Sequence, residues 1–124
     1  MALHTELPIH KEAYDLLDNL MQLAKNLPRD MKMLLGEKLR DESLSVLDMV
    51  FKANSSQDKV PHLDALISSL QVIELLCRLA KDRRYISVGQ YAGAIKLTGS
   101  IGKQAGGWRK KFMSAPVSQS SRRT

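Results

Sequence analysis

One long stretch near the C-terminus, residues 87–112, contains neither a proline nor an acidic residue. It opens with Ser87 followed three residues later by Gln90, the spacing of a capping box, in which each side chain bonds the backbone N–H of the other residue. Lys96, Lys103 and Lys110 recur every seven residues, so a helix would place them along one slowly drifting line. The stretch therefore predicts a long helix that carries a line of positive charge.

Small residues form a second line on the same predicted helix. Ala92, Gly99 and Gly106 are also seven residues apart, and Gly102 lies beside them. Each glycine costs a helix roughly 1 kcal/mol relative to alanine. We expect close backbone approach to a neighbouring helix along this line to offset that cost.

The rest of the chain shows apolar residues at helical spacing in three further segments, and no alternation typical of strands. The predicted helices cover about residues 9–26, 30–53 and 58–82, with Pro8 in the first turn of the first helix. Short connections between long helices predict an all-α, antiparallel up-down four-helix bundle over residues 1–113. The proline- and serine-rich residues 114–124 are expected to form a disordered basic tail. Extra apolar residues from Leu44 to Phe51 suggest contacts with a second copy.

The composition fits a single soluble domain. The chain has 124 residues, of which 44% are hydrophobic, and no apolar run reaches the ~18 residues of a membrane span. Its one cysteine, Cys77, excludes an internal disulfide and favours the reducing cytoplasm. Because Cys77 stands among leucines, we interpret it as a small buried residue rather than a reactive thiol.

Charge is distributed unevenly along the chain. Residues 1–77 hold 8 Lys/Arg and 12 Asp/Glu, whereas residues 78–124 hold 11 Lys/Arg and a single acid, Asp82. A strongly basic C-terminal part indicates a polyanionic partner, with nucleic acid favoured over a membrane surface.

Catalytic and metal-binding patterns are absent from the sequence. His4, His10 and His62 stand in different segments without the spacing of a metal site. The glycines of residues 99–107 fall inside a predicted helix rather than after a strand, which argues against a phosphate-binding loop. We expect no enzymatic activity, no cofactor and no metal.

The end of the last predicted helix resembles a known family. Residues 101–110, IGKQAGGWRK, are similar to the "IG-basic-x-x-GGW-basic" end of a family of small bacterial four-helix-bundle proteins. The resemblance extends over about residues 7–112 and includes the segments YDLLDNLMQLAKNLPRD and LCRLAKDRRYIS. The family has two branches, the accessory variability determinants (Avd) of diversity-generating retroelements and the proteins encoded by intervening sequences of the large ribosomal RNA gene. The basic segment 81–91, the isoelectric point near 9.6 and the lack of acids in residues 95–101 favour the retroelement branch.

The resemblance implies a non-catalytic partner of a reverse transcriptase. Avd-like proteins form pentameric, barrel-shaped assemblies that bind the retroelement reverse transcriptase and the template RNA. The complex makes mutagenised cDNA, which then diversifies a target gene. Catalysis belongs to the polymerase in this scheme.

Nucleic-acid contacts are predicted at two groups of basic residues. The first lies in the last helix: Lys96, Lys103, Arg109, Lys110 and Lys111. The second lies before it: Arg78, Lys81, Arg83 and Arg84. The alternative for the first group is an ordinary solvated helix face, and for the second it is stabilisation of the preceding helix dipole. Trp108 is interpreted as a packing residue rather than a base-stacking one. Tyr85 and Tyr91 are expected in the core or in an interface.

Two other functions remain open at the level of sequence. The chain could be a protein of the ribosomal intervening-sequence type, which its gene neighbourhood would reveal. It could also be a basic protein–protein adaptor that contacts an acidic partner and has little affinity for RNA.

Overall fold

The structure is a computed structural model, and it describes residues 6–114. The regular secondary structure of these residues is entirely helical, without a strand. The elements are α1 (Pro8–Ala24), α2 (Arg29–Met31), the π-helical segment η2 (Lys32–Gly36), α3 (Glu37–Ser55), α4 (Val60–Asp82) and α5 (Val88–Ser114). The predicted disordered tail lies outside the described residues except for Ser114, which ends α5.

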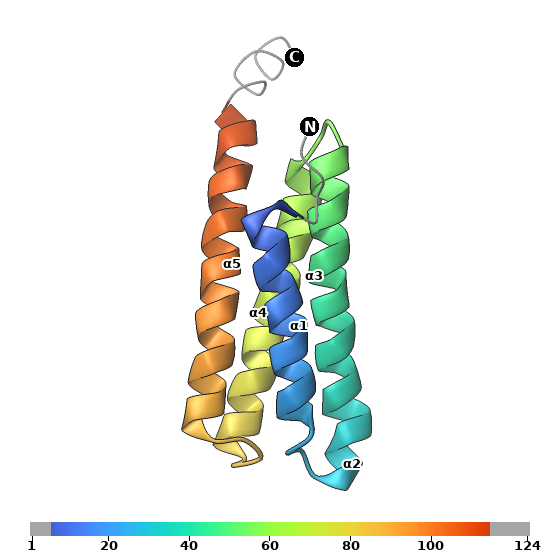
Figure 1. The fold of residues 1–124 in the computed structure, drawn as a ribbon, viewed down its shortest axis with the longest axis vertical. Helices are drawn as coiled ribbons and strands as arrows, with labels where there is room; N and C mark the ends of the chain where they lie inside the picture. The colour runs from blue at the N-terminus through green and yellow to red at the C-terminus, as the bar shows by residue number, and fades with distance from the viewer. Residues whose placement is uncertain (1–5, 115–124) are drawn as a thin grey trace.

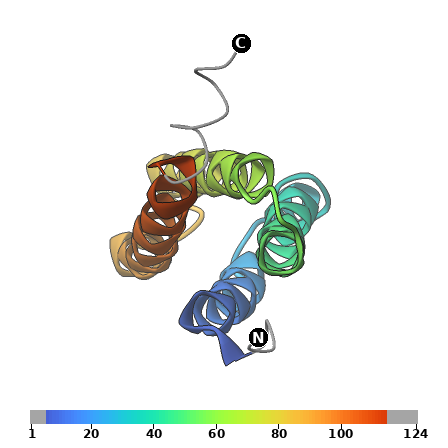
Figure 2. The same cartoon turned by 90° about the horizontal axis from the view of Figure 1, so that it is seen from above.

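Four long helices lie side by side (Figure 1). The connections that follow α1 and α4 are at one end of the molecule, and the connection between α3 and α4 is at the other end, beside the end of α5. The end-on view shows the helices around a common centre in the order α1, α3, α4, α5 (Figure 2). Each of them contacts its two neighbours, so α1 and α4 stand on opposite corners. The predicted four-helix fold is confirmed.

Every long helix contributes leucine or isoleucine side chains to one continuous core. Leu16, Leu39, Leu66 and Ile101, one from each of the four helices, are all completely buried. Burying a side chain of this size contributes about 1.5–3 kcal/mol. The helical spacing of these residues in the sequence is therefore what brings the four helices together.

The second predicted helix is interrupted by the π-helical segment η2. Met31, Leu35, Leu39 and Ser43 follow one another at four-residue intervals, and all four face inward at least in part. Such a run drifts around an α-helix by about 40° per step, since the helix has 3.6 residues per turn. The wider i→i+5 turn corrects this drift. The predicted helix over about residues 30–53 is therefore confirmed in its extent, but residues 32–36 form a π turn within it.

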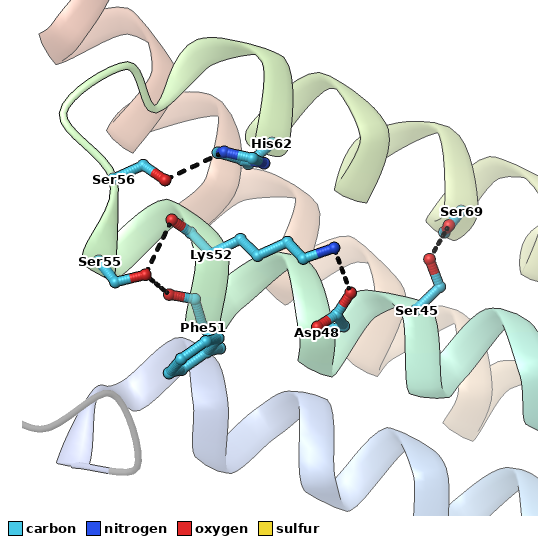
Figure 3. A network of polar contacts seen from close by, with 8 residues as sticks. All are labelled: Ser45, Asp48, Phe51, Lys52, Ser55, Ser56, His62 and Ser69. Atoms are coloured by element: carbon cyan, nitrogen blue, oxygen red, sulfur yellow. Dashed lines mark hydrogen bonds and ion pairs between the residues drawn. The ribbon is translucent and has the colours of Figure 1, made fainter.

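Polar contacts join α4 to α3 and to the turn between the two helices (Figure 3). The Ser69 hydroxyl donates to Ser45 Oγ at 3.3 Å, and Ser56 Oγ lies 3.1 Å from His62 Nε2. Along α3 itself, Lys52 Nζ lies 2.9 Å from Asp48 Oδ2. These contacts satisfy polar groups at the helix–helix boundary, and they account for His62 as a structural residue.

Lys59 closes the C-terminal end of α3. Its Nζ donates to the carbonyl oxygens of Ala53 and Ser56, both at 2.7 Å, and to that of Asn54 at 3.3 Å. These carbonyls would otherwise lack partners because they end a helix. The same ammonium group lies 5.9 Å from the ring centre of Trp108, which packs against the core as predicted.

Cys77 is completely buried on α4, as predicted. Burial, with a smaller contribution from the negative charge of Glu74, raises the pKa of the Cys77 thiol to about 12. The thiol therefore stays protonated at neutral pH, and a protonated thiol is a poor nucleophile.

Candidate nucleic-acid interface

The predicted capping box forms at the start of α5. The backbone N–H of Ser87 donates to Gln90 Oε1 at 2.9 Å, and the backbone N–H of Gln90 donates to Ser87 Oγ at 3.0 Å. The helix that carries the candidate site therefore begins where the sequence places it.

The predicted lysine line lies on the outer face of α5. Lys96, Lys103 and Lys110 are all exposed. Successive lysines stand about 10.5 Å apart along the axis, since seven residues each rise 1.5 Å. The opposite face of the helix is buried and consists of Ala94, Thr98, Ile101 and Ala105. Together these positions give α5 one packed side and one charged side.

The glycines do not pack as the sequence suggested. A Cβ atom added at Gly99, Gly106 or Gly107 would meet nothing within 4 Å, and Ala92 is exposed. Of the positions in the predicted small-residue line, only Gly102 faces a neighbour, with Leu70 Cδ1 3.6 Å from its added Cβ, which is ordinary van der Waals contact. The predicted close approach of a neighbouring helix within the chain was therefore wrong. Gly99 and Ala92 fall on the same outer face as the lysines because α5 turns by about 100° per residue.

Arg109 and Lys111 flank Lys110 near the C-terminal end of α5. The Arg109 Nε pairs with Asp64 Oδ1 of α4, so this guanidinium is held against the bundle. The Lys111 Nζ lies 6.0 Å from the ring centre of Phe112. Both side chains remain near the C-terminal end of the lysine line, but Arg109 already has a carboxylate partner.

The second basic group lies at the other end of the molecule, around the α4–α5 turn. Arg78 Nε and Lys81 Nζ lie 3.9 Å and 3.5 Å from the Asp82 carboxylate. Lys81 also lies 4.6 Å from the ring centre of Tyr91, which is half-buried. Arg83 is exposed. Asp82, the single acid of residues 78–124, thus neutralises part of the positive charge of this group.

Arg84 stands in the left-handed backbone region, with φ of 62°. The backbone N–H of Tyr85 donates to the Ala80 carbonyl at 2.8 Å, and that of Arg84 donates to the Lys81 carbonyl at 2.9 Å. This pair of bonds is a Schellman motif, which ends a helix and usually has glycine at the position of Arg84. The side chain borders an open hollow of about 750 Å³ that Lys81, Ser87 and other residues of the turn also line.

Three acids that anchor α5 had no signal in the sequence. Besides Asp64, Glu74 Oε2 accepts from the Thr98 hydroxyl at 2.8 Å, and Glu12 Oε2 accepts from Gln104 Nε2 at 2.9 Å. All three lie on other helices, and only the tertiary fold brings them to α5. These contacts fix the position of α5 against its neighbours, so the exposed lysines of α5 are carried by a helix that is held in place.

The described residues contain no candidate metal-binding site. Within 6–114, no cluster of three or more His, Cys, Asp or Glu residues is arranged to hold a metal ion. Nor does any helix in this range have the combined length and apolar character needed to cross a membrane.

The fold and the charged side of α5 define a small helical-bundle protein with an exposed basic face. The sequence profile of the bAvd-like family matches residues 7–112, and the chain belongs to this family. The predicted Avd-type identity is thereby confirmed, whereas a relation to ribosomal intervening-sequence proteins stays a prediction. No curated protein and no solved structure matched the chain.

Proposed function

We propose that this chain is a non-catalytic accessory protein of a diversity-generating retroelement. In this role it binds the reverse transcriptase and the template RNA or its cDNA, and it supports mutagenic reverse transcription and retrohoming. It acts in the cytoplasm as a homo-oligomer, and the family resemblance favours a pentamer. The observation that carries the proposal is an acid-free helix with exposed lysines in a member of the bAvd-like family.

Phosphate groups are the natural ligands of the lysine line. Lys96, Lys103 and Lys110 present point charges along one face, and each phosphate contact releases counterions from the nucleic acid. Reading of bases needs planar groups that bond two atoms of a base edge, such as arginine or asparagine. Lysine is instead a point charge on a flexible stem, so binding depends mainly on charge and shape, with weak sequence preference. The polymerase and the folded RNA then supply specificity.

The second basic group has a separate role in the proposal. Arg83 and Arg84 lie at the α4–α5 turn, where they either extend the nucleic-acid surface or contact the polymerase. Arg78 and Lys81 are partly neutralised by Asp82, which favours stabilisation of the α4 terminus for these two.

A binding assay with a matched control tests the nucleic-acid role. Labelled structured RNA is titrated with the wild type and with a variant in which Lys96, Lys103 and Lys110 are changed to Glu. The control changes Lys11, Lys25 and Lys32, three exposed lysines outside α5, to Glu and so alters the net charge by the same amount. The proposal expects the first variant to lose binding and the control to retain most of it.

Equal loss in both variants would mean that only total charge matters, and it would contradict an interface on α5. Absence of RNA binding by the wild type would favour the adaptor function instead. Helicity of each variant is checked by circular dichroism before binding is measured. Co-purification with the reverse transcriptase of the proposed retroelement tests the polymerase contact.

A further inference from the structure

The aromatic rings of α5 are engaged within the molecule. Tyr91 and Trp108 are half-buried and pack against the core. The Lys81 ammonium group lies 4.6 Å from the ring centre of Tyr91. The Lys59 ammonium group lies 5.9 Å from the ring centre of Trp108 and 5.3 Å from that of Phe112, which is also half-buried. All three rings of the helix therefore contact the protein's own core or its own cations.

Unpaired nucleic acid is usually held by exposed aromatic rings. Proteins that bind single strands stack successive bases on such rings, and one stacked base adds roughly 5- to 150-fold to the affinity. Two aromatic side chains among the described residues are exposed, Tyr14 on α1 and Phe51 on α3. Within Val88–Ser114, α5 thus offers exposed lysines to a phosphate backbone but no exposed ring to the bases.

The lysine line is also straight and held in place. Lys96 and Lys110 are separated by about 21 Å along the axis, since fourteen residues each rise 1.5 Å. Thr98 and Gln104, which lie between them, bond to carboxylates of α4 and α1. Exposed Gly99 and other small residues flank the line, so no bulky side chain hinders the approach of a broad ligand. The line therefore presents fixed charges to a fixed array of phosphates.

A double helix provides such an array. It is stiff over this distance, since the persistence length of DNA, for example, is about 50 nm. A flexible single strand must instead lose conformational freedom to lay its phosphates along the line, and ordering of this kind lowers affinity. Stacking on rings could offset the loss, but α5 exposes none. Stiffness and charge density both favour the paired form.

We propose that the lysine line binds the phosphates of a double-helical segment of RNA in preference to an unpaired strand. The inference rests on the proposed function, and it names the substrate class of the same site. Double-stranded RNA is recognised mostly by shape and by contacts to phosphates and 2′-hydroxyls. Lysines on a rigid helix supply the phosphate part of that recognition.

Titration with matched RNAs tests this preference. A labelled RNA duplex and each of its two strands, designed not to pair with themselves, are titrated with the full chain by fluorescence anisotropy at one salt concentration. The duplex is expected to bind at least about tenfold tighter than either strand. The variant with the lysine line changed to Glu should lose duplex binding. The control variant with Lys11, Lys25 and Lys32 changed to Glu should keep the preference, and circular dichroism verifies that both variants fold.

Trp108 provides a second readout because it is the only tryptophan of the chain. A base that stacks on its ring would quench its fluorescence, whereas phosphate contacts along the lysine line leave the ring in the core. Neither RNA form is therefore expected to change the emission strongly. Strong quenching by the single strands, together with tight binding, would overturn the inference.

The remaining outcomes separate the inference from the proposed function. Single strands that bind as tightly as the duplex would overturn the preference, while loss of their binding in the lysine-line variant would leave the nucleic-acid role of α5 standing. A duplex preference that survives unchanged in the lysine-line variant would place the duplex site elsewhere and also overturn the inference. A wild type that binds neither form would overturn both the inference and the nucleic-acid role on which it rests.

Discussion

α4 and α5 are consecutive helices that pack into the same core, yet they expose very different residues. The outer side of α4 includes Leu75 and Leu79, whereas the outer side of α5 carries Lys96, Lys103 and exposed Gly99. Both helices bury an apolar stripe in the same core, so the fold does not require this difference. Exposed leucines suit a protein partner, and lysines without intervening acids suit a polyanion. The two surfaces therefore indicate two kinds of partner on one bundle.

The largest expected effect separates the buried side of α4 from its exposed side. Leu66→Ala removes a completely buried side chain and is expected to lower the free energy of unfolding by about 2–5 kcal/mol. Leu75→Ala, on the same helix, should change it by less than about 0.5 kcal/mol. Urea denaturation of both variants measures the contrast. Similar losses would mean that Leu75 is buried in solution, for example by another copy.

The substitution Thr98→Val tests the hydrogen bond that joins α5 to α4. This change keeps the shape of the side chain but removes the hydroxyl that donates to Glu74. The Glu74 carboxylate then loses a partner in a half-buried place, and a loss of about 1–3 kcal/mol in unfolding free energy is expected. Glu74→Gln in the Thr98→Val background should recover part of it, because it removes the negative charge. An unchanged unfolding midpoint for Thr98→Val would contradict the anchoring role of this bond.

Replacing glycines of α5 with alanine is expected to change the stability by a smaller amount and in the opposite direction. Gly99→Ala adds a methyl group in open space and should stabilise the protein by roughly 1 kcal/mol through helix propensity. Gly102→Ala places its methyl group 3.6 Å from Leu70 Cδ1, so its gain should be similar or lower. Thermal unfolding of both variants provides the measurement. Destabilisation by Gly99→Ala would show that a partner in solution covers the glycine line.

The smallest expected effect lies at the turn that joins the two helices. Arg84→Gly relieves the left-handed backbone conformation, and it should be neutral or stabilising by about 0.5 kcal/mol, since the added flexibility of the unfolded chain offsets part of the gain. The same variant reports on the role of the side chain in RNA binding. Weaker RNA binding with unchanged stability would place Arg84 in the interface. A clear loss of stability would contradict the Schellman geometry.

Local patterns in the sequence were enough to predict the helices and the exposed lysine line. Ser87 and Gln90 act within one turn, and Lys96 to Lys110 depend only on helical spacing, so neither needs tertiary information. The prediction that the small residues of α5 pack against a neighbouring helix was wrong because spacing shows which residues share a face of a helix but not which face the bundle covers. Asp64, Glu74 and Glu12 were missed as anchors of α5 for the same reason. The π turn was visible in principle, in the repeated four-residue spacing from Met31 to Ser43.

The salt dependence of RNA binding tests the role of the α5 face most directly. The logarithm of the binding constant is measured against the logarithm of salt concentration for the wild type and for the variant with Lys96, Lys103 and Lys110 changed to Glu. Each phosphate contact contributes about 0.7–0.9 to the slope, so loss of three contacts should reduce its magnitude by about 2 to 3. An equal slope in the two folded proteins would contradict phosphate contacts along this helix.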